Sequence, residues 1–90
     1  MKLKLKEGFV VREVGGKKYA VATGEAARSF KGMLSLNEIG TVIFSLLQTG
    51  TTVDQIVKRI RSEYDVLEEV VVADVNNFIR QLESIDVLEK

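Results

Sequence analysis

The sequence of 90 residues contains no cysteine and no histidine. Without cysteine the chain cannot form disulfides, thiolate metal sites or a cysteine nucleophile. Without histidine it lacks the usual general base of enzymes and the commonest metal ligand. These absences exclude several classes of site, so we expect no catalytic residue, no metal and no cofactor.

Long apolar segments are also lacking. Residues 1–6 alternate apolar side chains with lysine, and this start is too short and too charged for a signal peptide. No apolar run approaches the roughly 20 residues that a membrane-spanning helix needs. We therefore expect a cytoplasmic protein that does not enter membranes. A chain of this length buries only about 60–65% of its extended surface, so residues 1–90 are expected to form one domain with one modest core.

Net charge is absent as well, because 13 basic residues balance 13 acidic ones. The balance is uneven along the chain. Residues 1–36 carry eight Lys or Arg and three Glu, whereas residues 37–90 carry five Lys or Arg and ten Asp or Glu. A neutral chain has no overall attraction to nucleic acid or to anionic membranes. The split indicates either a dipolar domain or a partner with a complementary split of charge.

What the sequence does contain begins with a β-hairpin signal. Residues 9–14 and 18–23 are rich in β-branched side chains, and Gly15-Gly16 between them accepts the positive φ angles of a tight turn. A two-residue turn places Glu13 opposite Lys18. Both faces of this hairpin carry apolar residues, so the pattern leaves open which face is buried.

A third strand is predicted after a connection. Residues 24–32 form this connection, in which residues 25–28 could make one helical turn between flanking glycines. Met33–Leu36 then reads as a short strand, with Leu34 and Leu36 on one face and the other two residues on the opposite face.

Three helices are predicted after the third strand. The first covers residues 38–48 behind the N-cap Asn37, the second begins with a capping box at Thr52–Gln55, and the third covers residues 68–84. Apolar residues at helical spacing are expected to face the core: Ile39, Val42, Ile43, Leu46 and Leu47; Val53, Ile56, Val57, Ile60 and Tyr64; Val71, Val75, Phe78, Leu82 and Ile85. The predicted fold is α+β and winged helix-turn-helix-like, with a three-stranded antiparallel sheet followed by three helices.

Such a fold suggests DNA binding, but the charges oppose it. A recognition helix supplies Arg, Lys, Asn or Gln to base edges, whereas residues 68–86 hold five carboxylates and one arginine. These carboxylates would be repelled by phosphates. An enzyme is disfavoured too, because the carboxylates alternate with basic residues and the glycines have no phosphate-loop spacing. We keep a DNA-binding winged helix as an alternative and expect no catalysis.

Peptide binding has positive support. If residues 33–36 form an edge strand, their free amides and carbonyls could pair with an extended peptide. Val72, Asn76 and Ile79 lie to one side of the apolar stripe of residues 68–84 and could form a second wall. The alternative is that these residues belong to a broad apolar stripe that packs under the sheet in the core. Phe44, off the centre of its own stripe, could also contact the peptide, as could Met33, although burial in the core is favoured for each. A scaffold or dimerisation subunit could use the same edge on itself.

An ordered series of motifs resembles the PqqD family, also known as the RiPP recognition element, over about residues 7–89. The motifs are the hairpin 9–23, Leu36-Asn37-Glu38 with Gly40, Leu46-Leu47 followed by Gly50-Thr51-Thr52, Ile56-Val57, Tyr64-Asp65, Asp74-Val75, Phe78-Ile79 with Leu82, and Val87-Leu88. The family's pattern often has a Ser, Thr or Asp cap before the third helix, where this chain has Leu67.

The resemblance implies a winged-helix-like, non-catalytic chaperone. Such a protein binds the leader segment of a ribosomally made precursor peptide and delivers it to a modifying enzyme, commonly a radical S-adenosylmethionine enzyme. The leader pairs with the third strand and rests on the third helix. Carried over by position, the implied peptide contacts are Met33, Leu34, Ser35, Leu36, Val71, Val72, Val75, Asn76 and Ile79.

Overall fold

A tight hairpin opens the fold in the computed structural model, which describes residues 2–29 and 32–89. Strands β1 (Phe9–Val14) and β2 (Lys17–Ala22) pair antiparallel, with Glu13 opposite Lys18 as predicted. The turn needs its glycines, because Gly15 and Gly16 have φ of 58° and 81°. Such left-handed angles match a two-residue hairpin turn to the twist of its strands.

The third strand completes an antiparallel sheet with the order β1-β2-β3. β3 (Met33–Leu36) has the predicted bounds. A short helix α1 (Ala26–Ser29) precedes it, one residue later than the predicted helical turn, and raises the number of helices above the predicted three. Residues 30 and 31 of the predicted connection lie outside the described residues.

Burial identifies the inner face of the sheet. Phe9, Ala20 and Leu36 are at most 9% exposed, and they lie on one face because cross-strand partners share a face. The opposite face carries Val14 and Met33, each 61% exposed. The choice that the sequence left open is therefore settled in favour of the face that holds Phe9.

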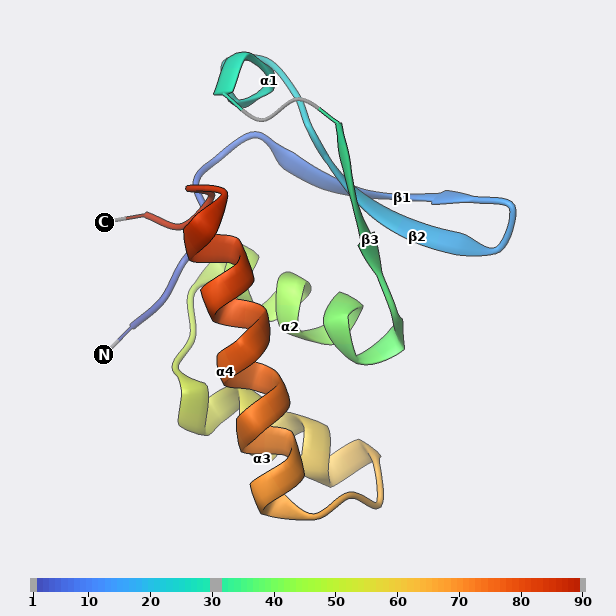
Figure 1. Cartoon of the computed structure of the whole chain (residues 1–90), viewed down its shortest axis with the longest axis vertical. Helices are drawn as coiled ribbons and strands as arrows, with labels where there is room; N and C mark the ends of the chain where they lie inside the picture. Colours follow the sequence, from blue (N-terminus) through green and yellow to red (C-terminus); the bar gives the residue numbers. More distant parts are fainter. Residues whose placement is uncertain (1, 30–31, 90) are drawn as a thin grey trace.

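Three longer helices follow, and Figure 1 shows the sheet at one end of the molecule, α3 at the other end and α4 reaching from one to the other. They are α2 (Glu38–Thr49), α3 (Val53–Glu63) and α4 (Glu68–Ser84). α4 has the predicted bounds, and α2 is one residue longer than predicted. The fold is thus α+β, a three-stranded antiparallel sheet followed by helices, as predicted.

Phe44 is buried, as the sequence favoured, whereas Met33, for which burial was also favoured, is 61% exposed because it lies on the outer face of the sheet. The Phe44 side chain is only 1% exposed and meets Phe9 edge-on, with ring centroids 6.4 Å apart. The apolar side of α2 is wider than the stripe read from the sequence, because it packs against the sheet as well as against the other helices. Phe44 is therefore a core residue that anchors α2 to β1, and it is unavailable to a peptide.

The N-terminal segment closes the molecule. Leu5 is buried, and backbone bridges join Leu3 to Thr51 and Leu5 to Leu88. A lysine–aspartate pair, Lys6 Nζ to Asp86 Oδ2 at 3.1 Å, adds a surface contact. Within the described ranges, none of the helices combines the length and apolarity that crossing a bilayer requires.

The capping box of α3 gives a test of local stability. Thr52 Oγ1 accepts a hydrogen bond from the Gln55 amide, and Gln55 Oε1 accepts one from the Thr52 amide, both at 3.2 Å. We expect Thr52→Ala to lower the free energy of unfolding by about 1 kcal/mol, because an amide of the first turn loses its acceptor. Urea denaturation measures this. Ser45→Ala, at an exposed position inside α2, is the control and should change stability much less; equal losses would contradict the role of the cap.

Candidate functional site

The candidate site begins at the free edge of β3. This strand pairs on one side with β2, from Lys18 opposite Leu36 to Val21 opposite Met33. In the sheet formed by the described residues it is the last strand, so no strand covers its other side. An edge strand of this kind offers backbone donors and acceptors to an incoming chain.

The register decides which backbone groups are free. Successive residues of an antiparallel strand direct their N–H and C=O groups alternately to the strand on one side and to the strand on the other. In a hairpin with a two-residue turn, the two residues that flank the turn are hydrogen-bonded to each other. Counting from that turn, Ala20 directs its backbone groups to β3, where Leu34 is its partner. Leu36 is oriented like Leu34. Met33 and Ser35 therefore turn their N–H and C=O groups outward, and neither has a backbone hydrogen bond to a described residue outside the sheet.

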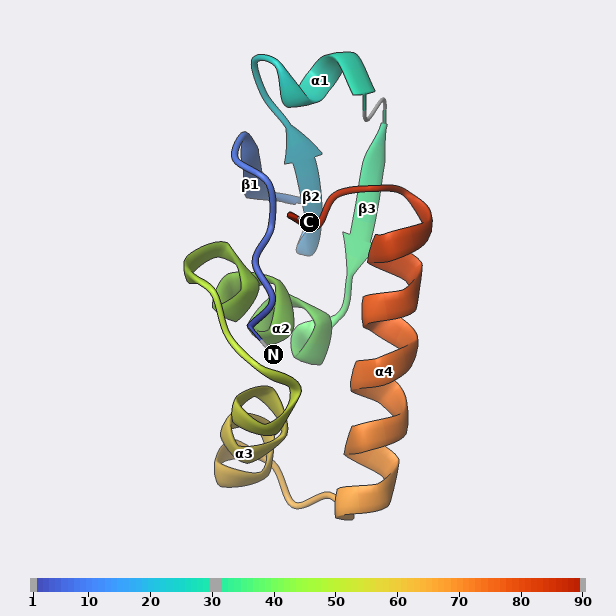
Figure 2. The ribbon, with the colours of Figure 1, turned by 90° about the vertical axis from the view of Figure 1, so that its left-hand side faces the viewer.

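In Figure 2 the C-terminal turns of α4 lie beside the end of β3, and the rest of the helix extends beyond the strand toward α3. A hollow of about 310 Å³ separates α4 from the segment that follows β3, and we call it the α4 hollow. It is lined by Asn37, Ile39, Gly40 and Ile43 from one side and by Asp74, Asn77, Phe78 and Gln81 from α4.

At Gly40, α2 and the Phe78 side chain of α4 come close together. A Cβ atom at this position would lie 3.3 Å from Phe78 Cε1 and 3.0 Å from Asn37 Oδ1. The Asn37 oxygen already accepts the Gly40 amide at 2.6 Å, which caps α2 as predicted. Glycine thus allows the half-buried Phe78 ring to rest on the first turn of α2, directly behind β3.

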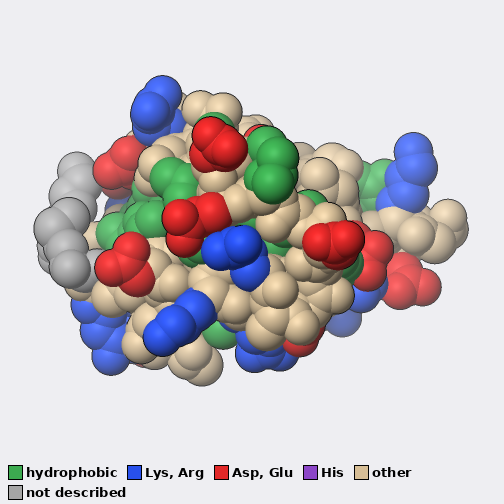
Figure 3. All heavy atoms as spheres, turned by 90° about the horizontal axis from the view of Figure 1, so that it is seen from below, with side chains coloured by type: hydrophobic (Ala, Val, Ile, Leu, Met, Phe, Trp, Pro, Cys, Tyr) green, Lys and Arg blue, Asp and Glu red, His purple; other side chains and the backbone are tan. Residues whose placement is uncertain are grey.

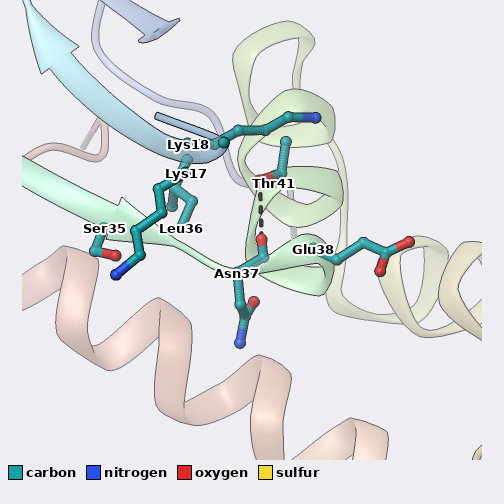
Figure 4. A pocket seen from close by; sticks show the side chains of 8 residues that line it. Lys17, Lys18, Ser35, Leu36, Asn37, Glu38 and Thr41 are labelled. Atoms are coloured by element: carbon teal, nitrogen blue, oxygen red, sulfur yellow. Dashed lines mark hydrogen bonds between the residues drawn. The ribbon is translucent and has the colours of Figure 1, made fainter. Parts of the chain in front are cut away.

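A second hollow of about 430 Å³ lies at the Leu36 end of β3, and we call it the lysine hollow. Figure 4 shows its lining, in which two lysine side chains extend in different directions. The lining residues are Gly16, Lys17, Lys18, Ser35, Leu36, Asn37, Glu38 and Thr41. Asn37, the residue directly after β3, lines both hollows.

Glu38 is held at the side of the lysine hollow. Its Oε1 accepts a hydrogen bond of 2.8 Å from the Tyr64 hydroxyl, which comes from the end of α3. This hydrogen bond and the negative charge of Glu38 raise the pKa of Tyr64 above its usual value of 10.0. Neither Lys17 nor Lys18 forms an ion pair with a described residue. The hollow therefore offers two ammonium groups that the protein itself does not neutralise.

The four predicted contact residues of β3 differ in how much of each side chain is exposed to a binding peptide. Met33 and Ser35 are exposed, Leu34 is half-buried, and Leu36 is only 6% exposed because its side chain belongs to the core. Leu36 can therefore offer a partner little apolar surface. The strand is available to a peptide through its outward backbone groups and through the Met33 side chain.

The predicted residues of α4 lie away from this edge. Val71, Val75 and Ile79 are buried, with Ile79 7% exposed, so they pack inside the core. Val72 lines hollows together with α3 residues such as Arg61, on the flank of α4 that faces α3. Asn76 is half-buried and lies on the same flank by helical spacing. The structure therefore does not join these residues to β3, and a peptide contact for Val72 and Asn76 stays a prediction.

Sequence reasoning missed the flank of α4 that faces the start of α2, the segment directly after β3. Phe78 was placed at the centre of the core stripe, yet it is only half-buried, while Ile79 takes the core position expected of it. Asp74 entered only as one of the five carboxylates and as part of a family motif, and Asn77 and Gln81 were not singled out. One signal could have found this flank: Gly40, a glycine in the first turn of a helix, marks a place where another side chain approaches closely.

The face of the molecule seen from below gives no support to DNA binding. Figure 3 shows basic and acidic side chains interspersed on the face seen from below, without a continuous basic area. Two arginines of α3 are paired with carboxylates, Arg59 with Glu63 at 2.8 Å and Arg61 with Glu68 at 3.5 Å. Within the described ranges, no group of three or more acidic side chains could hold a metal ion.

Comparisons with known proteins show the family of this chain and agree with its fold. Residues 17–88 match the sequence model of a family described as coenzyme PQQ synthesis protein D (PqqD). A solved structure, described as TbiB1 in complex with the TbiA(beta) leader peptide, is similar with a TM-score of 0.73 and 26% sequence identity. The similarity covers 96% of this chain and 94% of the TbiB1 chain. No curated protein matches the chain.

Proposed function

The chain belongs to the PqqD family, and from that premise we propose that it binds the leader segment of a ribosomally made precursor peptide and presents it to a modifying enzyme. The family is non-catalytic, and the similar structure of TbiB1 holds a leader peptide. We further propose that the modifying enzyme is of the radical S-adenosylmethionine class. Because the precursor is made by ribosomes, we propose that the two meet in the cytoplasm.

The vacant edge of β3 is the observation that carries this proposal. Strand addition would supply main-chain hydrogen bonds of low sequence selectivity, and the neighbouring hollows would supply selectivity. Met33 and Ser35 offer outward backbone groups, and the exposed Met33 side chain and the half-buried Phe78 offer apolar surface. The peptide backbone would run between β3 and α4.

Titration of a labelled leader peptide into the protein tests the proposal. The probe is the N-terminal segment of a small precursor encoded next to this gene, and fluorescence anisotropy reports its binding. We expect a dissociation constant in the micromolar range or tighter, equivalent to about 8 kcal/mol or more. The affinity should change little with salt, because backbone pairing and apolar contacts dominate.

Two controls separate the alternatives. Duplex DNA should not bind; binding of DNA that falls steeply with salt would support the winged-helix alternative instead. Light scattering with and without peptide tests the scaffold alternative. A dimer that the peptide dissociates would mean that the free chain uses the same edge on itself.

A further inference from the structure

The lysine hollow adds a charge requirement to the proposed peptide. We propose that Lys17 and Lys18 bind one or two acidic side chains of the peptide, at the point where it passes the Leu36 end of β3. This inference rests on the proposed function, because it needs a peptide strand on β3.

Geometry brings both lysines to the path of such a strand. Neighbouring strands lie about 4.8 Å apart, so a peptide paired with β3 would lie about 10 Å from β2. The lysine stems are long enough to cover much of that distance. Lys18 lies opposite Leu36, and the hollow that both lysines line also includes Ser35 and Leu36 of β3. Their ammonium groups can therefore reach side chains that leave the end of the added strand.

Alternation sharpens the prediction. Lys17 and Lys18 are consecutive in a strand, so their side chains lie on opposite faces of the sheet. Consecutive residues of the added peptide also alternate between these faces. One lysine thus serves each face, and two adjacent peptide residues could each meet a cation. A single Asp or Glu of the peptide could bind one of the lysines, and two adjacent acidic residues could bind both.

The surrounding charges leave the two cations available. Two carboxylates are near: Glu13, opposite Lys18 in β1, and Glu38 in the lining of the hollow. Glu38 is engaged by the Tyr64 hydroxyl, and in Figure 4 its side chain extends away from the lysines. Glu13 is exposed and lies on the β1 side of β2, away from the edge where the peptide would bind. An incoming carboxylate would thus meet two cations with little competition.

Other basic residues of the described chain differ from this pair. Lys6, Arg28, Arg59 and Arg61 each have a carboxylate within 4.0 Å. Five further basic residues, Lys2, Lys4, Arg12, Lys58 and Arg80, have no described ion pair, but none of them lines a hollow beside β3. Lys58 and Arg80 are both exposed, and they provide a matched pair of charges for a control.

A displayed library of random peptides provides the test, with the wild-type protein as bait. We expect the selected peptides to share an extended apolar segment, with Asp or Glu enriched at one fixed position beyond it. Replacing that acid by its amide should weaken binding several-fold in wild type, the range expected for exposed charge pairs. In Lys17→Gln/Lys18→Gln the acid and amide peptides should bind alike, whereas Lys58→Gln/Arg80→Gln should keep the preference.

Charge reversal completes the experiment. Lys17→Glu/Lys18→Glu should prefer a peptide with lysine at the fixed position, and circular dichroism confirms that the variant is folded. Selected peptides without an acidic preference, or a preference that persists in Lys17→Gln/Lys18→Gln, would overturn the inference and leave the proposed function standing. If neither the library nor the neighbouring leader yields a ligand, the proposed function itself fails, and the inference fails with it.

Discussion

Proline at position 35 is expected to weaken leader-peptide binding about 5- to 150-fold while the domain stays folded. The Ser35 amide points away from β2, so proline would remove a donor that only an added strand uses. A peptide carbonyl would then be left unpaired beside β3, at a cost of about 1–3 kcal/mol. Edge strands tolerate proline where the lost N–H faces away from the sheet. Anisotropy titration measures the affinity, and thermal unfolding monitors the fold.

Ser35→Ala is the matched control, because it removes the hydroxyl and keeps the amide. It should bind the peptide about as well as wild type. Leu34→Pro is the reverse control: its amide bonds to β2, so this variant should lose stability as well as binding. Unchanged affinity in a folded Ser35→Pro variant would show that the peptide does not pair with this edge, and would remove the basis of the proposed function.

The sequence predicted the backbone of this molecule better than its surfaces. The glycine pair at the hairpin turn and the caps Asn37 and Thr52 each act locally, so strand register and helix starts followed directly from residue types. The start of α4 at Glu68 also agreed, although Leu67 supplies no side-chain cap. Periodicity over the length of α4 was enough to define that helix.

Burial was harder to predict, because the side chains that a helix buries depend on which other elements pack against it. Helical spacing centres the apolar stripe of α4 without saying how far α2 and α3 extend across its two sides. α3 covers the side that carries Val72, and the first turn of α2 meets the side that carries Phe78. Phe44 lies off the centre of the stripe of α2, and its burial, which was favoured, comes from contact with Phe9, 35 positions earlier in the chain. The hollows arise from tertiary contacts that no local pattern contains.

Phe78→Ala and Val72→Ala together test which flank of α4 receives the peptide. We expect Phe78→Ala to weaken leader binding about tenfold, equivalent to about 1.4 kcal/mol, because the half-buried ring lines the α4 hollow. Val72→Ala removes a half-buried apolar side chain of the same helix from the side facing α3. It should change affinity little, even if it lowers stability.

Stability must be measured beside affinity in both variants, since losing either side chain removes packing against the core. Gln81→Ala gives an independent measurement, because Gln81 is exposed and lines the same hollow as Phe78. A moderate loss of affinity with unchanged unfolding would place the peptide in that hollow without any change in the core. If Val72→Ala weakens binding more than Phe78→Ala does, the peptide rests on the flank that faces α3. The wall predicted from sequence, with Val72 and Asn76, would then be the correct one, and the strand on β3 would have to reach it around the end of α4.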